Sequence, residues 1–282
     1  MERRAFRAMG TDIELLVEAE AADDALTAAA AEFERLEALL SRFRETSELT
    51  RLNTHGSIDA GPDLRRVIEL ALDGRRRSGG RFDPTVHDAV VSAGYDRTFS
   101  DVTPDADRPA GPARPAGGDV QIEEGRIILA PGVRIDLGGI GKGYAAERAA
   151  EVLATAGPCL VNAGGDIATR SGVWPVGVET GTATITLELS GGALATSGRD
   201  RRTWRRAGRT LHHLIDPRTG APAQTDVLRV TVVAPDAVEA EIAATSLFLA
   251  GAERAAAEAD AAQQPAVIVD VRGLTTLAGG LG

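Results

Sequence analysis

The stretch Arg134–Ala150, RIDLGGIGKGYAAERAA, decides how the rest of the sequence is interpreted. Its β-branched start, around Ile135, predicts a strand that ends at Asp136. Glycines then remove Cβ atoms from the turn that follows, and Lys142 stands between two of them. Apolar residues at helical spacing predict a helix from Tyr144 onward. A strand, a glycine turn with a lysine and a helix together can bring backbone N–H groups and a cation to a phosphate.

Two familiar phosphate-binding motifs do not fit this stretch. A P-loop requires Ser or Thr after its Gly-Lys pair, and Gly143 occupies that place. The dinucleotide fingerprint requires its third glycine three residues after the second, whereas Gly143 follows Gly141 one residue early. The alternative from local physics alone is a tight turn whose glycines only supply positive φ angles.

Composition limits the classes of protein and partner. The 282 residues suit one large domain or two lobes that share a core, and 43% of them are apolar, which is enough for a sizeable core. The formal net charge of −10 argues against nucleic-acid binding. A phosphate-bearing ligand would therefore need local compensation from a metal ion or a few well-placed cations.

The sequence contains neither a disulfide pair nor a membrane segment. Cys159 is the sole cysteine, and its apolar neighbours predict a buried, inert thiol. The first residues lack the apolar run of a signal peptide, and no later run has the length of a membrane span. We expect a soluble, cytoplasmic protein without stable membrane insertion, although a leader that had been removed would leave the same sequence.

Hydrophobic periodicity predicts an α+β fold with mostly antiparallel sheet flanked by helices. A hairpin is expected over residues 4–18, and a proline-rich loop over residues 97–118. The second half contains many short strand patterns, one of them Leu211–Ile215. The expected helices cover residues 21–43, 62–77, 86–93, 237–249 and 251–262.

Polar and glycine-rich segments punctuate this pattern, and their order is informative. They are Met9–Thr11, Gly80–Val86, Asn162–Asp166, Thr196–Arg199, His213–Gly220, and Val232–Asp236 with Ala240–Thr245. Together, and with the central glycine turn, they resemble the FAD:protein FMN transferases, the ApbE-like flavinyltransferases. The resemblance extends from about Met9 to Gly251.

The resemblance implies a two-lobed single domain with a central cofactor cleft over residues 4–272, followed by a tail at 273–282. It also implies a reaction, in which FAD is the substrate and Mg²⁺ is required. FMN passes to a Thr or Ser hydroxyl of an acceptor flavoprotein, and AMP is released. In such a phosphoryl transfer, charge on the phosphate oxygens must be stabilised while the nucleophile is aligned.

The metal site of the family matches three places in this sequence. They are the backbone carbonyl of Gly139 and the side chains of Glu241 and Thr245, which share one helix face at i,i+4 spacing. The family usually has Asp at the position of Glu241. The extra methylene of Glu shifts the carboxylate, and Mg²⁺ demands near-ideal ligand geometry. Without the resemblance, Glu241 would be interpreted as a solvated helix charge.

The resemblance also assigns flavin-binding and catalytic positions. Lys142 and His213 are the catalytic candidates, and His213 is distinguished from its neighbour His212 only by the motif register. Asp166 and Ser197 are expected to support the site, and Asp216 to fix a turn. The expected FAD contacts are Met9, Phe43 (where many members carry Tyr), Arg81, Phe82, Asp83, Asp136, Lys142 and Ile215.

Two alternatives to flavin transfer remain at this stage. An FAD pyrophosphatase that yields FMN and AMP would need nearly the same residues, with water as the acceptor. A non-catalytic FAD-binding protein is the third interpretation, because Glu241 and Phe43 depart from the usual pattern.

Overall fold

The computed structural model describes residues 1–102, 110–181 and 183–281. The chain folds as two compact units, each assembled from separate stretches of sequence. Unit 1 comprises Met1–Glu37, Ile140–Gly198 and Thr225–Gly282, and unit 2 comprises Ala38–Gly139 and Arg199–Gln224.

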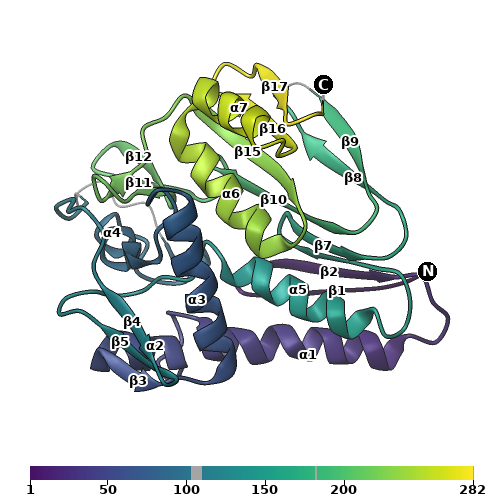
Figure 1. Cartoon of the computed structure of the whole chain (residues 1–282), viewed down its shortest axis with the longest axis horizontal. Helices are drawn as coiled ribbons and strands as arrows, with labels where there is room; N and C mark the ends of the chain where they lie inside the picture. Colours follow the sequence, from purple (N-terminus) through teal and green to yellow (C-terminus); the bar gives the residue numbers. More distant parts are fainter. Residues whose placement is uncertain (103–109, 182, 282) are drawn as a thin grey trace. The chain divides into compact units, whose positions relative to one another are not determined.

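Unit 1 is built on an eight-stranded antiparallel sheet with the order β1-β2-β6-β7-β10-β15-β16-β17 (Figure 1). Apolar residues of these strands fill the core. Some strands, such as β2, alternate buried with less buried residues, whereas β16 is buried throughout. Their bounds are β1 Glu2–Ala8, β2 Thr11–Val17, β6 Cys159–Ala163, β7 Asp166–Arg170, β10 Gly192–Gly198, β15 Val227–Ala234, β16 Ala266–Asp270 and β17 Thr275–Ala278. The strand β17 lies within the predicted tail and pairs with β16.

Helices and a separate hairpin complete unit 1. Helix α5 (Gly141–Leu153) packs on β6 and β7 and helix α6 (Ala237–Ala250) on β10 and β15, as Figure 1 shows. Helix α7 (Ala252–Ala261) follows α6, and α1 (Asp23–Leu40) has its last turn in unit 2. The hairpin β8 (Trp174–Glu179) and β9 (Thr184–Leu189) packs on the sheet through Leu160, Ile167, Trp174 and Leu194.

Unit 2 combines short helices with small sheets. One core cluster there joins α4 to Tyr95, Trp204 and Ile215, with the ring of Phe99 against Tyr95. A three-stranded sheet has the order β3-β5-β4, and two hairpins lie later in the sequence. The elements are α2 Glu48–His55, β3 Ser57–Asp59, α3 Pro62–Arg77, the 3₁₀ turns Pro84–Val86 and Phe99–Asp101, α4 His87–Ser92, β4 Val120–Glu123, β5 Arg126–Leu129, β11 Thr203–Arg206, β12 Arg209–His212, β13 Ile215–Asp216 and β14 Ala221–Pro222.

The predicted α+β class is confirmed, with antiparallel pairing throughout the large sheet. Helix α3 has the predicted bounds because Pro62 occupies its first turn and three arginines occupy its last turn. The first hairpin is confirmed as well, but its turn is Met9 and Gly10 rather than the expected Gly10–Asp12, because Thr11 and Asp12 already pair with Ala8 and Arg7. The predicted loop over 97–118 contains a 3₁₀ turn at Phe99–Asp101, and its residues 103–109 lie outside the described ones.

The predicted strand before the central glycine turn is wrong. Ile135 pairs with no strand, because the side-chain amide of Asn53 bonds both of its backbone groups at 2.8 Å. The next amide, of Asp136, donates to the carbonyl of Pro84 at 2.8 Å. The helix that follows begins at Gly141, three residues earlier than its apolar periodicity indicated.

The predicted strand Leu211–Ile215 is also wrong, since it divides into two elements. Strand β12 ends at His212, and β13 begins at Ile215. Between them, the carbonyl of Leu214 accepts from the amide of Ala223 at 2.9 Å. Strand β11 was not predicted, because its arginines hide the alternation that normally indicates a strand. No helix within the described residues has the length and apolarity needed to cross a bilayer.

Candidate active site

Two turns of unit 1 meet at one end of its sheet. Met9 holds a left-handed φ of 51° in the β1–β2 turn, an unusual conformation for a residue other than glycine, asparagine or aspartate. Its amide donates to the carboxylate of Glu37 at 3.0 Å. The β6–β7 turn approaches so closely that a Cβ on Gly164 would lie 2.1 Å from the hydroxyl of Thr11. Asp166 is the first residue of β7 and therefore lies at this end of the sheet.

Lys142 joins two buried carboxylates at the start of α5. Its ammonium donates to Asp166 and, at 2.7 Å, to Oε1 of Glu241. The three side chains come from the glycine turn, from β7 and from α6. Asp166 and Glu241 are 4% and 5% exposed in their side chains, so both negative charges are withdrawn from water. We call these three residues the Lys142 cluster; it carries two carboxylates and a single cation.

The second oxygen of Glu241 fixes the backbone of α5. Oε2 accepts from the amide of Gly143 at 3.0 Å, which satisfies an N–H in the first turn of the helix. A Cβ at Gly143 would lie 2.7 Å from the carbonyl oxygen of Ala237 and 2.9 Å from the Glu241 carboxylate. Glycine at 143 is therefore required by the close approach of α6, rather than by an unusual φ angle.

The pKa of Glu241 is raised to about 7, because burial and, to a smaller extent, the negative charge of Asp166 raise it more than Lys142 and the Gly143 amide lower it. This direction is expected for a carboxylate that shares a single cation with another carboxylate in a low-dielectric site. Glu241 is thus buried, and the interpretation of it as a solvated helix charge is wrong.

The donors around Glu241 have the chemistry of a site for Mg²⁺. One helical turn along α6, the hydroxyl of Thr245 lies 3.0 Å from the hydroxyl of Ser197 on β10. Among the described residues, no group of three or more His, Cys, Asp or Glu side chains is arranged to hold a metal. Mg²⁺ is nevertheless commonly held by one or two carboxylates together with water and substrate phosphates. The Lys142 cluster, with its excess of negative charge, fits that mode.

Asp136 in unit 2 is fully occupied by protein partners. Its carboxylate pairs with the guanidinium of Arg42 at 2.8 Å and accepts from the amide of Gly138 at 2.6 Å. Arg42 is held in turn by the rings of Phe43 and Tyr95, whose centroids lie 4.1 Å and 4.7 Å from its guanidinium carbon. Phe43 keeps 36% of its surface exposed, so its ring remains available to a ligand.

Asp83 is occupied in the same way at the end of α3. It pairs with Arg75 at 3.0 Å and accepts from both the amide and the hydroxyl of Thr85. The neighbouring Phe82 is buried, and its ring lies against Gly139, the last residue of unit 2 before Ile140. Arg81 is half-buried in the same turn.

The two adjacent histidines have different environments. His212 is buried, its Nε2 lies 3.0 Å from the carbonyl of Ala223, and burial lowers its pKa. His213 follows the end of β12 and is half-buried. Ile215 is buried beside the rings of Tyr95 and Trp204.

Asp216 organises its turn, as predicted. Its carbonyl accepts from the amides of Thr219 and Gly220, and its carboxylate pairs with Arg218 at 2.8 Å. The hydrogen bond from the Arg218 guanidinium lowers the pKa of Asp216.

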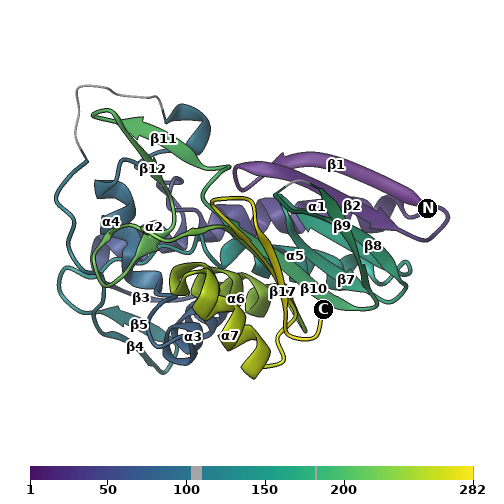
Figure 2. The same cartoon turned by 90° about the horizontal axis from the view of Figure 1, so that it is seen from above.

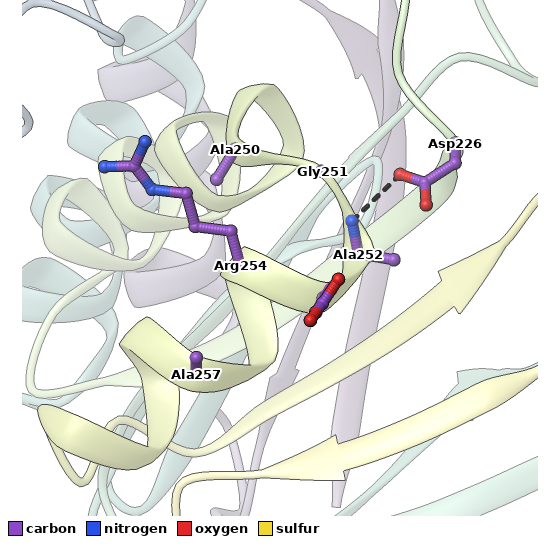
Figure 3. Close-up of a pocket in the computed structure, with 7 residues that line it drawn as sticks. Asp226, Ala250, Gly251, Ala252, Arg254 and Ala257 are labelled. Atoms are coloured by element: carbon purple, nitrogen blue, oxygen red, sulfur yellow. Dashed lines mark hydrogen bonds between the residues drawn. The ribbon is translucent and has the colours of Figure 1, made fainter.

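A surface hollow elsewhere in unit 1 is formed by the corner between α6 and α7. Figure 3 shows that Asp226 points at the start of α7, where its carboxylate accepts from the amide of Ala252 at 2.9 Å. The rest of the lining is mostly alanine and glycine, with Glu253 and Arg254 at the rim. Asp226 caps a helix, and the hollow offers no convergent set of reactive groups.

Sequence reasoning named the three members of the Lys142 cluster in separate roles, but it predicted neither their pairing nor the arginines of unit 2. Arg42 carries no motif signal beyond its position directly before Phe43, and its pairing with Asp136 joins residues far apart in sequence. The cap formed by Asn53 on Ile135 has the same long-range character. Asp166 was expected to support the site, and in the structure its carboxylate accepts a hydrogen bond from the ammonium of Lys142.

Comparison with protein families matches the model of the ApbE family to residues 9–269. This chain belongs to the ApbE family. The glycine turn with Lys142, the Asn162–Asp166 turn and the Glu241–Thr245 helix all lie within the matched residues.

Curated members of the ApbE family resemble the chain over most of its length. The FAD:protein FMN transferase of Treponema pallidum (strain Nichols) is 32% identical over 254 residues, which cover 78% of this chain and 70% of that protein. The protein of the same name from Vibrio cholerae is 30% identical and covers 82% of this chain and 74% of that protein.

Solved structures of ApbE proteins share the fold. The ApbE protein of Thermotoga maritima superposes with a TM-score of 0.85 at 24% identity, over 98% of this chain and 96% of that one. The flavin transferase ApbE of Vibrio cholerae gives a TM-score of 0.78 at 24% identity, over 98% and 97%.

Proposed function

We propose that this protein is a FAD:protein FMN transferase. It transfers the FMN part of FAD to a Thr or Ser hydroxyl of an acceptor flavoprotein and releases AMP. The observation that carries the proposal is the ApbE match over residues 9–269, together with a relative of that name at 32% identity over 78% of the chain.

The reaction exchanges the phosphoanhydride bond of FAD for a phosphoester bond to the acceptor. The acceptor hydroxyl oxygen forms a bond to the phosphorus on the FMN side of the pyrophosphate. The bond from that phosphorus to the bridging oxygen breaks, and AMP leaves with the electron pair. The proton of the hydroxyl is lost in the same process, so the site must compensate negative charge and accept a proton.

Lys142 is our candidate for phosphate binding. Its ammonium stands in a turn with few Cβ atoms, where a phosphate can approach the backbone, and Asp166 holds it in position. The other contact of the ammonium, with Glu241, can be exchanged for a phosphate oxygen once a second cation neutralises Glu241.

Mg²⁺ is the cation that we propose, held by the carboxylate of Glu241, the hydroxyl of Thr245 and the carbonyl of Gly139. When bound, it would neutralise charge on the phosphate oxygens and orient them. Two carboxylates share a single ammonium there, so the remaining negative charge around Glu241 favours a further cation.

We assign FAD recognition to residues within the ApbE match. Met9, Phe43, Arg81, Phe82 and Ile215 are proposed as direct contacts. Asp83 and Asp136 are already bonded to Arg75 and Arg42, so we assign them to shaping the flavin-binding turns. His213 is the proposed proton acceptor, because its neighbour His212 is buried and its Nε2 lies against the carbonyl of Ala223.

The test is turnover of FAD with and without divalent metal. The purified chain is incubated with FAD and Mg²⁺, and released AMP is measured by chromatography while candidate acceptor proteins are weighed by mass spectrometry. We expect AMP release together with a mass increase equal to an FMN phosphoester on one acceptor. AMP release with free FMN and no modified acceptor would indicate a pyrophosphatase, and binding of FAD without AMP release would contradict catalysis.

A further inference from the structure

The β11–β12 hairpin of unit 2 is the most basic segment of an acidic chain. Residues 199–209 contain six arginines and a single acidic residue, Asp200, whereas the whole chain carries a net charge of −10. None of these arginines belongs to the candidate active site. The hairpin is labelled in both views of the chain (Figures 1 and 2).

The inward face of the hairpin is fixed to the body of unit 2. Trp204 is 4% exposed, and its indole N–H donates to the carbonyl of Ala93 at 2.9 Å. Arg206, two residues on and therefore on the same face, is buried and donates to the carbonyl of Gly94 at 3.3 Å. A Cβ at Gly94 would lie 2.6 Å from Nε of Arg206, so glycine there admits the guanidinium.

Two other arginines of the hairpin point into solvent. Arg205 alternates with the buried pair and lies opposite Thr210, and Arg209 follows the turn at Ala207 and Gly208. Both are exposed. Within the part of the chain that the structure describes, neither side chain makes an ion pair or a hydrogen bond. Their charges are therefore available to an external partner, on a strand pair whose position is fixed.

The chain leads from these arginines directly to the proposed active site. Strand β12 ends at His212, and His213 is the next residue. Arg209 precedes His213 by four residues, which corresponds to about 14 Å along an extended strand. A group bound at the arginines is thus held within a few residues of the proposed proton acceptor.

We propose that Arg205 and Arg209 form a docking surface for an acidic segment of the acceptor protein, next to the Thr or Ser that receives FMN. The choice of partner rests on the proposed function, which requires a second protein to reach His213. Charge complementarity favours a carboxylate-rich segment. An anionic membrane is disfavoured because the one aromatic side chain of the hairpin, Trp204, is buried and offers no anchor for insertion.

The test compares two synthetic, fluorescently labelled peptides of about 15 residues, each with a single central Thr. One peptide has Asp and Glu around the Thr, and the other has Asn and Gln at the same positions. Binding to the full chain is measured by fluorescence anisotropy. We expect the acidic peptide to bind at least about tenfold more tightly, and this preference to disappear at about 0.5 M salt.

The decisive variant is Arg205→Glu/Arg209→Glu, for which we expect the preference to be lost. Its matched control is Arg51→Glu/Arg66→Glu, which makes the same change of charge on exposed helix positions of unit 2. The control should retain the preference for the acidic peptide. An equal loss of this preference in both variants would show that it depends only on net charge, and would overturn the proposal. Arg205→Gln/Arg209→Gln should give an intermediate preference, which misfolding would not produce.

Two further measurements separate the remaining outcomes. Sedimentation with vesicles of phosphatidylcholine and phosphatidylserine tests the membrane, and binding to these vesicles without binding to the acidic peptide would overturn the proposal. FAD affinity, measured without peptide, should be the same in the wild type and the hairpin variant. If the wild type releases AMP from FAD in the presence of an acceptor protein but the two peptides bind equally, docking alone fails; if no acceptor protein supports AMP release, the proposed function fails whatever the peptides do.

Discussion

The Lys142 cluster of unit 1 and two ion pairs of unit 2 all bury carboxylates beside cations, but they distribute the charge differently. In unit 2, Asp136 has Arg42 and Asp83 has Arg75, so each carboxylate has a guanidinium of its own. In the Lys142 cluster of unit 1, Asp166 and Glu241 share a single ammonium.

This difference separates carboxylates with a cation of their own from carboxylates that share one. A buried one-to-one pair is electrically neutral, and removal of one partner leaves an uncompensated charge, so the pair serves to hold a loop in place. Burial together with the nearby charge of Asp166 raises the pKa of Glu241 to about 7, and the excess negative charge around a shared cation makes a further cation favourable. The same residue type therefore has different uses in the two settings.

The largest expected effect follows from removing the excess charge in unit 1. Glu241→Gln should abolish Mg²⁺-dependent AMP release, because a neutral amide cannot attract the ion. Glu241→Asp should retain or raise release, since the charge remains. The measurement is AMP release against Mg²⁺ concentration, with Glu239→Gln on the same helix as the control. Turnover by Glu241→Gln, or turnover in excess chelator, would show that the metal is held elsewhere or is not used.

The second prediction concerns His213. The carboxylates of Asp136 and Asp83 in unit 2 are paired with arginines, so His213 is the proposed proton acceptor of that unit. His213→Ala should slow AMP release by about 10²–10⁴-fold while FAD affinity changes little. His212→Ala should mainly lower thermal stability, because its side chain is buried against the Ala223 carbonyl. Rates and FAD titrations of both variants decide this, and a silent His213→Ala would shift the assignment to another residue.

Breaking a one-to-one pair in unit 2 should affect folding. Arg42→Met leaves the buried Asp136 without its cation, which costs about 3–5 kcal/mol of unfolding free energy. Urea denaturation measures the change. Arg42→Met combined with Asp136→Leu should recover part of the loss, because both charges are then removed. A single variant as stable as the wild type would contradict a structural role for the pair.

Lys142→Met tests whether the shared cation behaves differently. Its cost in unfolding free energy should be smaller than that of Arg42→Met, because Glu241, with its pKa near 7, can take up a proton in place of the ammonium contact. FAD turnover should nevertheless fall, since the phosphate loses its cation. Denaturation and AMP release measured on the same preparation separate the two roles, and wild-type turnover would remove Lys142 from the site.

The smallest effect is expected at the exposed pair of Arg218 and Asp216. Arg218 lowers the pKa of Asp216, so the stabilisation is present above the unfolded pKa and is lost as pH falls through the lower folded pKa. Because Arg218 is 72% exposed, Arg218→Ala should cost at most about 1 kcal/mol at pH 7. The difference from the wild type in urea denaturation should shrink below about pH 4; a difference that stayed constant would point to lost packing instead.

The sequence by itself determined the α+β class, the hairpin at the start, helix α3 and the ordered motifs of the ApbE family. These features are local, because hydrophobic periodicity, proline and glycine act within a few residues of their position. The i,i+4 spacing of Glu241 and Thr245 is local in the same sense, and α6 carries both.

Only the tertiary structure decided how the charges are paired. Lys142 and Glu241 are 99 residues apart in sequence, and Asn53 is 82 residues from Ile135, which it caps where a strand was expected. Such pairs depend on which elements pack together, and no local pattern contains that information. The division between neutral pairs and a shared cation therefore arises from packing, because burial removes the water that would otherwise make every one of these carboxylates alike.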